Sequence, residues 1–283
     1  MLWQSMTTYL KSWFNYPGLE GKMIPVSIGL ALVFGAVWLL TIWPPLTKKP
    51  WLWVVGIVGA FLTVLAGAFV QTPLHYYYVK LMTHFWDSNT LNNQLLLVNI
   101  PVALIIALVQ EGAKMVPIVF WWMMSGRKIT PKTGLIIGAM AGAGFGIFGA
   151  VFAHNQAFIA HWTWSEFHRN AWQALLPFWD TFWSVAAQAG ISALVGYGLA
   201  KGKGWQSYLG ATVLHAAMLY FRVLYAKYPN TFNENRVEIT LAGVTALVML
   251  VVIYLRWRKD DAELAPMVTE PPAAPPAIDT PAQ

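Results

Sequence analysis

Seven long apolar stretches constrain the fold of this chain more than any other feature. They cover residues 24–43, 51–71, 95–124, 133–160, 178–200, 205–225 and 237–257. A helix needs about 20 residues to cross about 30 Å of hydrocarbon, and it satisfies every backbone amide within its own segment. Charged residues make up only 11% of the chain, against about 25% in an average soluble domain. We therefore expect an all-α fold, a polytopic membrane helical bundle of about seven transmembrane helices in contact with the lipid bilayer.

Basic residues between these stretches predict the orientation of the bundle. The segments on the side of the carboxyl terminus contain Lys48, Lys49, Arg127, Lys128, Lys132, Lys201, Lys203, Arg256, Arg258 and Lys259. Because such residues favour the cytoplasmic side, we expect a multi-pass protein of the cell (inner) membrane with its N-terminus outside and its C-terminus in the cytoplasm. These short loops explain the formal net charge of +6. They form no continuous basic face, so we expect no nucleic acid partner.

The two ends of the chain differ in composition from the spans. Residues 1–22 begin with apolar and aromatic side chains spaced among polar ones, which favours an amphipathic segment lying in the membrane interface. Residues 23–258 would then form the transmembrane domain. Residues 259–283 are rich in Pro and Ala and cannot bury a core, so we expect a disordered cytoplasmic tail. Among the connections, only residues 72–94 are long enough for a substantial loop, which we expect on the outer side.

Glycines recur at four-residue spacing in the fourth stretch. They are Gly134, Gly138, Gly142 and Gly146. Small residues at this spacing let two helix backbones approach closely. We expect the partner helix to belong to the same chain rather than to a second copy.

The third stretch carries charged residues near its centre, where insertion of each costs about 2.5–3.5 kcal/mol. Glu111 and Gln110 precede Lys114 by three and four positions, so all three share roughly one helix face. Two interpretations are open. Glu111 and Lys114 neutralise each other and only fix helix packing, or this face lines a polar cavity that holds a metal, a water or a substrate group. Gln188 and His215, at similar depth in two other stretches, favour the cavity.

Over roughly residues 95–220, the order and spacing of these groups resemble the PrsW-type intramembrane metalloproteases, which are related to the CAAX prenyl proteases. The first family motif, Glu-Glu-x-x-Lys, corresponds to residues 110–114, and the second, Gly-x-Gly-Phe-Ala-x-x-Glu-Asn, to residues 142–150. The third, His-x-x-x-Ser/Thr, corresponds to residues 188–192, and the fourth begins at His215. The resemblance implies that a carboxylate and imidazoles hold or activate a water that attacks a peptide carbonyl.

The chain departs from the family at the positions that carry this chemistry. The departures are Gln110 for the leading Glu, Gly149 and Ala150 for Glu-Asn, Gln188 for the third-motif His, and Leu219 for the final Asn or Asp. The expected groups that remain are Glu111, Lys114, Ser192 and His215. A neutral amide accepts no proton near neutral pH and is a poor ligand for zinc. We therefore expect the familial general-base mechanism to be lost.

Three functions are compatible with these residues. The first is a divergent, catalytically impaired PrsW-like homologue that binds a membrane partner or scaffolds a complex without a cofactor. Its polar network would contain Gln110, Glu111, Lys114, Gln188, Ser192 and His215. The second is an active intramembrane metalloprotease of membrane-protein substrates that uses divalent zinc, with Glu111 as base or metal ligand and His215 as metal ligand or oxyanion donor. The third is a transporter or an accessory subunit of a membrane complex.

Three histidines recur every seven residues near the end of the fourth stretch. They are His154, His161 and His168. If one helix continued through them, neighbours would lie about 10 Å apart along its axis, which is too far for one tetrahedral metal site. We interpret them as interfacial residues beside Trp162 and Trp164.

Overall fold

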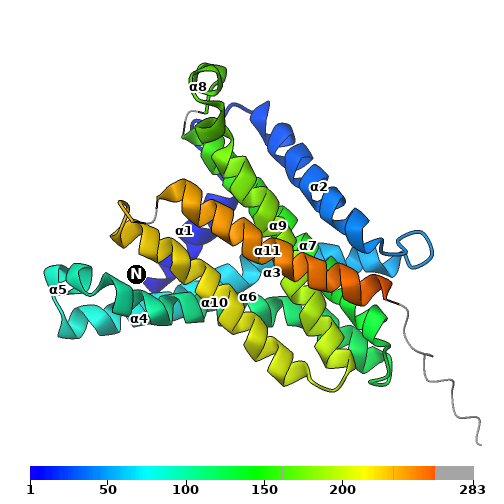
Figure 1. Cartoon of the computed structure of the whole chain (residues 1–283). Helices are drawn as coiled ribbons and strands as arrows, with labels where there is room; N and C mark the ends of the chain where they lie inside the picture. Colours follow the sequence, from blue (N-terminus) through cyan, green and yellow to red (C-terminus); the bar gives the residue numbers. More distant parts are fainter. Residues whose placement is uncertain (161, 232, 259–283) are drawn as a thin grey trace, which may run out of the picture.

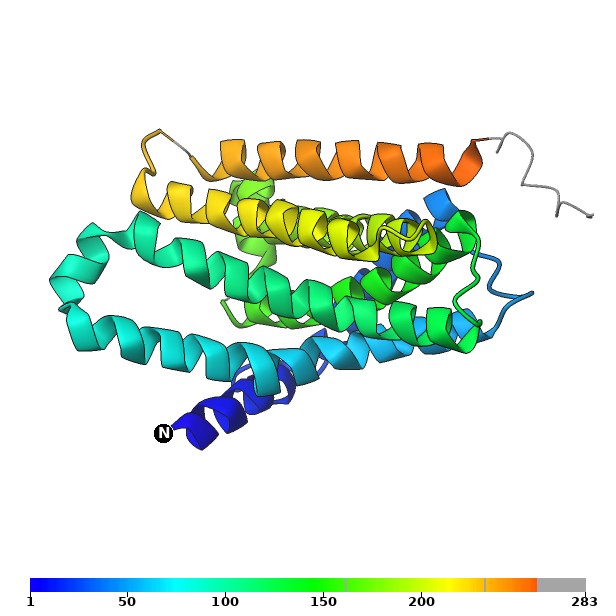
Figure 2. The ribbon, with the colours of Figure 1, turned by 90° about the horizontal axis from the view of Figure 1, so that it is seen from below.

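The computed structural model describes residues 1–160, 162–231 and 233–258, and these ranges contain helices but no strand. Seven segments are long and apolar enough to cross a membrane (Figures 1 and 2). This confirms the expected all-α bundle, and the chain is a multi-pass membrane protein. The elements are α1 (Leu2–Phe14), α2 (Met23–Ile42), α3 (Trp51–Ala66), η1 (Gly67–Gln71), α4 (Thr72–Phe85), α5 (Ser88–Asn93), α6 (Leu95–Met124), α7 (Pro131–Ile159), α8 (Trp164–Arg169), α9 (Ala171–Ala200), α10 (Gly204–Lys227) and α11 (Glu234–Trp257).

Helix α7 lies at the centre of the bundle and packs against α9, α3 and α2. Its glycines make the closest approach to α9, as the four-residue spacing predicted. A Cβ atom at Gly146 would lie 3.0 Å from Val185 Cα, and one at Gly138 would lie 3.0 Å from Ala193 Cα. At Gly142 it would overlap the backbone of Gln188. The close-packed partner therefore belongs to the same chain, as expected, and it fixes the position of Gln188 relative to α7.

The second span continues well beyond the predicted stretch. Helix α3 passes through the π-helical η1 into α4 without a break, so the expectation of a loop over residues 72–94 is wrong. Pro73 accounts for the π-helical segment. It lacks an N–H, and in a regular α-helix its ring would clash with the carbonyl four residues earlier. In η1 the backbone widens, and the Thr72 N–H bonds to the Gly67 carbonyl. The chain turns only at Trp86 and Asp87 before the short α5.

Helix α1 packs across the bundle beside the start of α4 (Figure 2). Its Trp13 ring stacks on Phe152, with ring centroids 4.5 Å apart, whereas Trp3 and Phe14 are largely exposed. Residues on both faces of α1 are thus apolar, and its location in the membrane interface stays a prediction. The expected disordered tail, 259–283, lies outside the described residues.

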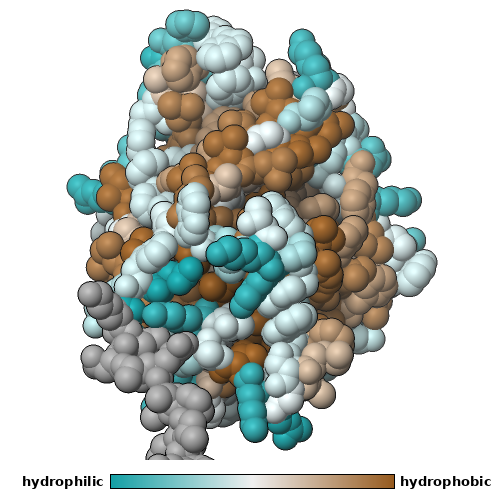
Figure 3. All heavy atoms as spheres, turned by 90° about the vertical axis from the view of Figure 1, so that its right-hand side faces the viewer, coloured by the Kyte–Doolittle hydropathy of each residue, from teal (hydrophilic) through white to brown (hydrophobic). Residues whose placement is uncertain are grey.

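The ends of the spans are polar and their sides apolar. Figure 3 looks at the end where α11 terminates, and hydrophilic residues gather there between apolar flanks. Alternating crossings bring the basic connections to this end, and Arg256 binds the Ile42 carbonyl at 2.8 Å. Trp51 and Trp121 stack on each other with ring centroids 3.6 Å apart. Trp43 is exposed at the end of its span, as suits a tryptophan that anchors a helix at the membrane interface.

Candidate functional site

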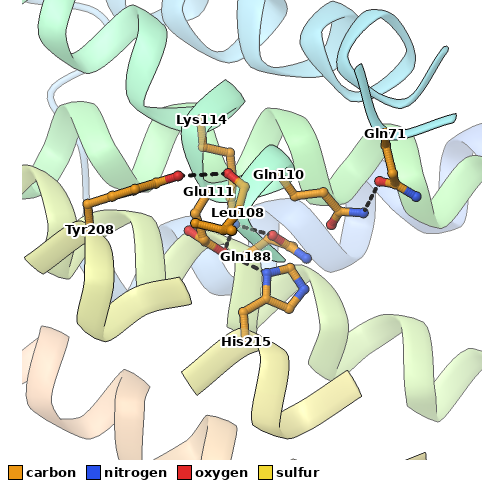
Figure 4. A network of polar contacts seen from close by, with 8 residues as sticks. All are labelled: Gln71, Leu108, Gln110, Glu111, Lys114, Gln188, Tyr208 and His215. Atoms are coloured by element: carbon orange, nitrogen blue, oxygen red, sulfur yellow. Dashed lines mark hydrogen bonds and ion pairs between the residues drawn. The ribbon is translucent and has the colours of Figure 1, made fainter. Parts of the chain in front are cut away.

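A buried ion pair lies at the middle of α6. Glu111 and Lys114 are one helical turn apart, and Lys114 Nζ donates to Glu111 Oε1 at 2.6 Å (Figure 4). Each side chain is only 1% exposed. Because removing two charges from water costs several kcal/mol per ion, such a pair requires further hydrogen bonds to be stable. Helices α9 and α10 supply them.

Helix α10 brings His215 to the same carboxylate. Its Nδ1 lies 2.6 Å from Glu111 Oε1. A carboxylate only accepts hydrogen bonds, so Nδ1 carries the proton. The other ring nitrogen points away from Glu111 (Figure 4), and His215 lines a cavity in the bundle. One ring nitrogen is therefore fixed by Glu111 while the other is directed away from it.

Helix α9 contributes Gln188, whose Oε1 accepts a hydrogen bond from Lys114 Nζ. We call Glu111, Lys114, Gln188 and His215 the central network. Lys114 Nζ also lies 5.4 Å from the centroid of the Phe145 ring on α7, within the range of a cation–π interaction. The ammonium is thus surrounded by a carboxylate, an amide oxygen and a ring face.

Two residues expected in this network have other surroundings. Gln110 Nε2 donates to Gln71 Oε1 at 3.2 Å, on the π-helical η1. Adjacent residues of an α-helix point about 100° apart, which explains why Gln110 diverges from Glu111. Ser192 is buried at the seam between α9 and α7, and its hydroxyl has no partner within the described part of the chain. No described hydrogen bond joins Gln110 or Ser192 to the central network.

A cavity of about 310 Å³ adjoins the central network. Gln110, Gln188 and His215 line it at this end, and Tyr9 and Trp13 of α1 line it on another side. The remaining lining comes from Thr63 of α3 and from α7, α9, α10 and α11. The cavity therefore lies among the membrane-spanning helices, with α1 as part of its wall.

A second charged cluster, which we call the Arg222 triad, lines the same cavity. It consists of Asp180 on α9, Arg222 on α10 and Glu238 on α11. Arg222 donates two hydrogen bonds to the Asp180 carboxylate, one of them from Nη1 at 3.1 Å. Arg222 Nη2 also lies 3.5 Å from Glu238 Oε1. Sequence reasoning missed this cluster, although all three residues fall just inside the ends of predicted spans.

The donor set does not fit the zinc that the resemblance implies. A catalytic zinc site usually takes three protein ligands, and the described ranges contain no group of three or more His, Asp, Glu or Cys side chains that could hold a metal. The central network offers only Glu111 and His215. In addition, the Lys114 ammonium binds the same carboxylate oxygen as His215.

The histidines of the seven-residue series do not lie on one helix. His154 is buried in α7, where its ring nitrogens bond to the Ser27 carbonyl at 3.3 Å and to the Thr181 hydroxyl at 2.8 Å. It connects three helices and is not interfacial, contrary to our interpretation. His168 is in the separate helix α8, and His161 lies outside the described residues.

No family model, no curated protein and no solved structure matches this chain. The resemblance to the PrsW-type proteases stays a prediction from the motifs.

Proposed function

We propose that this chain is a noncatalytic membrane protein, a divergent relative of the PrsW-type proteases that binds a segment of a membrane-protein partner in its polar cavity. The observation that carries this proposal is that Glu111 is buried and engaged in hydrogen bonds. Its Oε1 accepts from both Lys114 and His215, and the side chain is 1% exposed. A general base must reach the water that it activates. A buried carboxylate whose oxygen already accepts two hydrogen bonds is poorly suited to this.

The amides on the cavity wall support the binding role. Gln110 and Gln188 stand where the family has an acid and an imidazole, and both line the cavity. An amide side chain has donors and an acceptor that do not titrate. Polar backbone groups of a membrane segment need hydrogen-bond partners in the absence of water. At these two positions the cavity thus retains hydrogen-bonding groups where the family has groups that exchange protons.

Site-specific photocrosslinking in native membranes tests this function. A photoreactive amino acid is placed at Leu219, which lines the cavity, or at Val116, which is 52% exposed on α6. We expect an adduct with one membrane polypeptide from position 219 and only lipid adducts from position 116. The adduct should keep the full length of its partner. Absence of a polypeptide adduct at 219, or the same adduct at both positions, would overturn the proposal.

One observation favours a second candidate, a hydrolase without metal. Glu111 fixes Nδ1 of His215, and an imidazole oriented in this way by a carboxylate can exchange protons through its other nitrogen. In this case the adduct from position 219 would contain a shortened polypeptide. His215→Ala would restore its full length, and Lys227→Ala, on the same helix away from the cavity, would not.

A further inference from the structure

Two hydrogen-bonding groups in the cavity of the Arg222 triad lack a partner among the described residues. Thr245 on α11 is 1% exposed, and no described residue bonds to its hydroxyl. The indole N–H of Trp183 on α9 is likewise buried without a described partner. Both residues line the cavity. Since a buried polar group without a partner destabilises the fold, these two groups point to a ligand that accepts hydrogen bonds.

The triad itself favours a positive group. Asp180 and Glu238 contact the same nitrogen of one guanidinium, Arg222 Nη2. With both carboxylates ionised, the triad has one negative charge in excess. Asp180 is bonded by two nitrogens of Arg222, whereas Glu238 lies at the longer distance of 3.5 Å from the guanidinium and is 9% exposed. Glu238 is thus the acceptor with capacity for a further cation, since a buried charge requires a close partner.

We propose that this end of the cavity binds a ligand that carries a primary ammonium beside hydrogen-bond-accepting oxygens, as in a phosphoethanolamine group. The ammonium donates to Glu238, and the ligand oxygens accept from Thr245 and the Trp183 N–H. A primary ammonium has three donors, which suits a carboxylate already shared with Arg222. The same chemistry occurs in an aminophospholipid headgroup and in a soluble amine phosphate.

The charged end of the site lies at the depth of a headgroup, whereas Thr245 and Trp183 lie deeper, 11 residues from the start of α11 and 12 from the start of α9. Glu238 is four residues from the start of α11, and Arg222 is five residues from the end of α10. At 1.5 Å per residue, both lie within about 8 Å of the helix ends. The start of α9 is held to α11 here by a hydrogen bond from Trp172 Nε1 to Asn235 Oδ1 at 2.9 Å. Two of the three helices that form the subsite, α9 and α11, are therefore fixed relative to each other at this end.

Binding by the purified full chain in detergent tests the proposal. The probes are dihexanoyl phosphatidylethanolamine and free phosphoethanolamine, each paired with its choline counterpart, which lacks N–H donors. We expect at least one ethanolamine probe to bind about tenfold more tightly than its choline counterpart, because hydrogen bonds to charged groups are worth about 1.5–3 kcal/mol. Binding of the lipid alone identifies a headgroup site, and binding of both probes identifies an amine phosphate site.

Matched variants connect the binding to named residues. Glu238→Gln should weaken ethanolamine binding about tenfold, and Thr245→Val should weaken it by a smaller factor, whereas Thr245→Ser should retain it. The controls Glu234→Gln and Thr240→Val change exposed residues of the same helix and should bind as the unmodified chain does. Equal affinity for ethanolamine and choline probes, no binding of either probe, or unchanged binding by Glu238→Gln would each overturn the inference.

This inference rests on the proposed function only in using the same cavity. If the ethanolamine probes fail to bind while the adduct from position 219 forms, the headgroup subsite is wrong and partner binding stands. If the probes bind and no polypeptide adduct forms, the reverse holds.

Discussion

Glu111 on α6 and His215 on α10, 104 positions apart in the sequence, meet through a 2.6 Å contact between Oε1 and Nδ1. The contact joins two helices at the depth where lipid offers no hydrogen bonds. Lys114 completes it, because its ammonium neutralises the carboxylate and binds Gln188 on α9. One ion pair therefore holds three helices together, and its loss should lower the thermal stability of the bundle.

Removing Lys114 alone should destabilise the bundle more than removing the ion pair. Lys114→Met leaves the 1%-exposed Glu111 without its cation, and an unpaired buried charge costs about 3–5 kcal/mol. Adding Glu111→Gln to Lys114→Met removes that charge and should recover part of the loss. Thermal unfolding of the purified single and double variants in one detergent measures the difference. Equal melting temperatures for the two variants would show that the pair does not stabilise the fold.

The glycine seam should be intolerant of a single methyl group. Gly138→Ala would place Cβ against the α9 backbone, 3.0 Å from Ala193 Cα, and overpacking of this kind costs about 1–3 kcal/mol. Gly149→Ala is a matched control on the same helix, since its Cβ would meet no atom within 4 Å. We expect a lower melting temperature for the first variant only. Similar stability of both variants would contradict the observed α7–α9 approach.

The absence of cysteine makes the membrane orientation directly testable. Because the chain contains no cysteine, Lys49→Cys and Asn89→Cys each introduce a single thiol. The two positions lie at opposite ends of the bundle. The positive-inside rule predicts that an impermeant maleimide labels Asn89→Cys in intact cells. Lys49→Cys should react only after the membrane is permeabilised. The opposite labelling pattern would show that the predicted orientation is wrong, with no consequence for the fold.

The sequence predicted what depends on local pattern. Hydropathy located seven spans, and four-residue spacing located the seam from Gly134 to Gly146, because both are properties of single helices. The continuation of α3 into α4 was not predictable, because the π register of η1 that precedes Pro73 has no signature in one sequence. Charges near span ends are usually assigned to the interface, so the positions of Arg222 and Glu238 gave no signal of a cluster inside the bundle.

The candidate site was predicted only in part. Motif order identified Glu111, Lys114, Gln188 and His215 as residues of similar depth, and the structure brings them together. Gln110 bonds to Gln71, and the π-helical backbone of η1 sets the direction in which the Gln71 side chain points. One sequence does not reveal which side chains of two distant helices meet in this way.

Restoring the family residues should not restore a zinc site. In Gln188→His the ring would lie beside the Lys114 ammonium, and in Gln110→Glu the new carboxylate would face Gln71 on η1. Neither change removes Lys114 from Glu111 Oε1, so a third ligand would not converge on Glu111 and His215. We expect the double variant to bind no zinc above the level of the unmodified chain when the metal in the purified protein is measured. If it binds about one zinc per chain, and Glu111→Ala abolishes that binding, then residue 110 can turn into the central network, and the chain retains the geometry of a metal site that two substitutions restore.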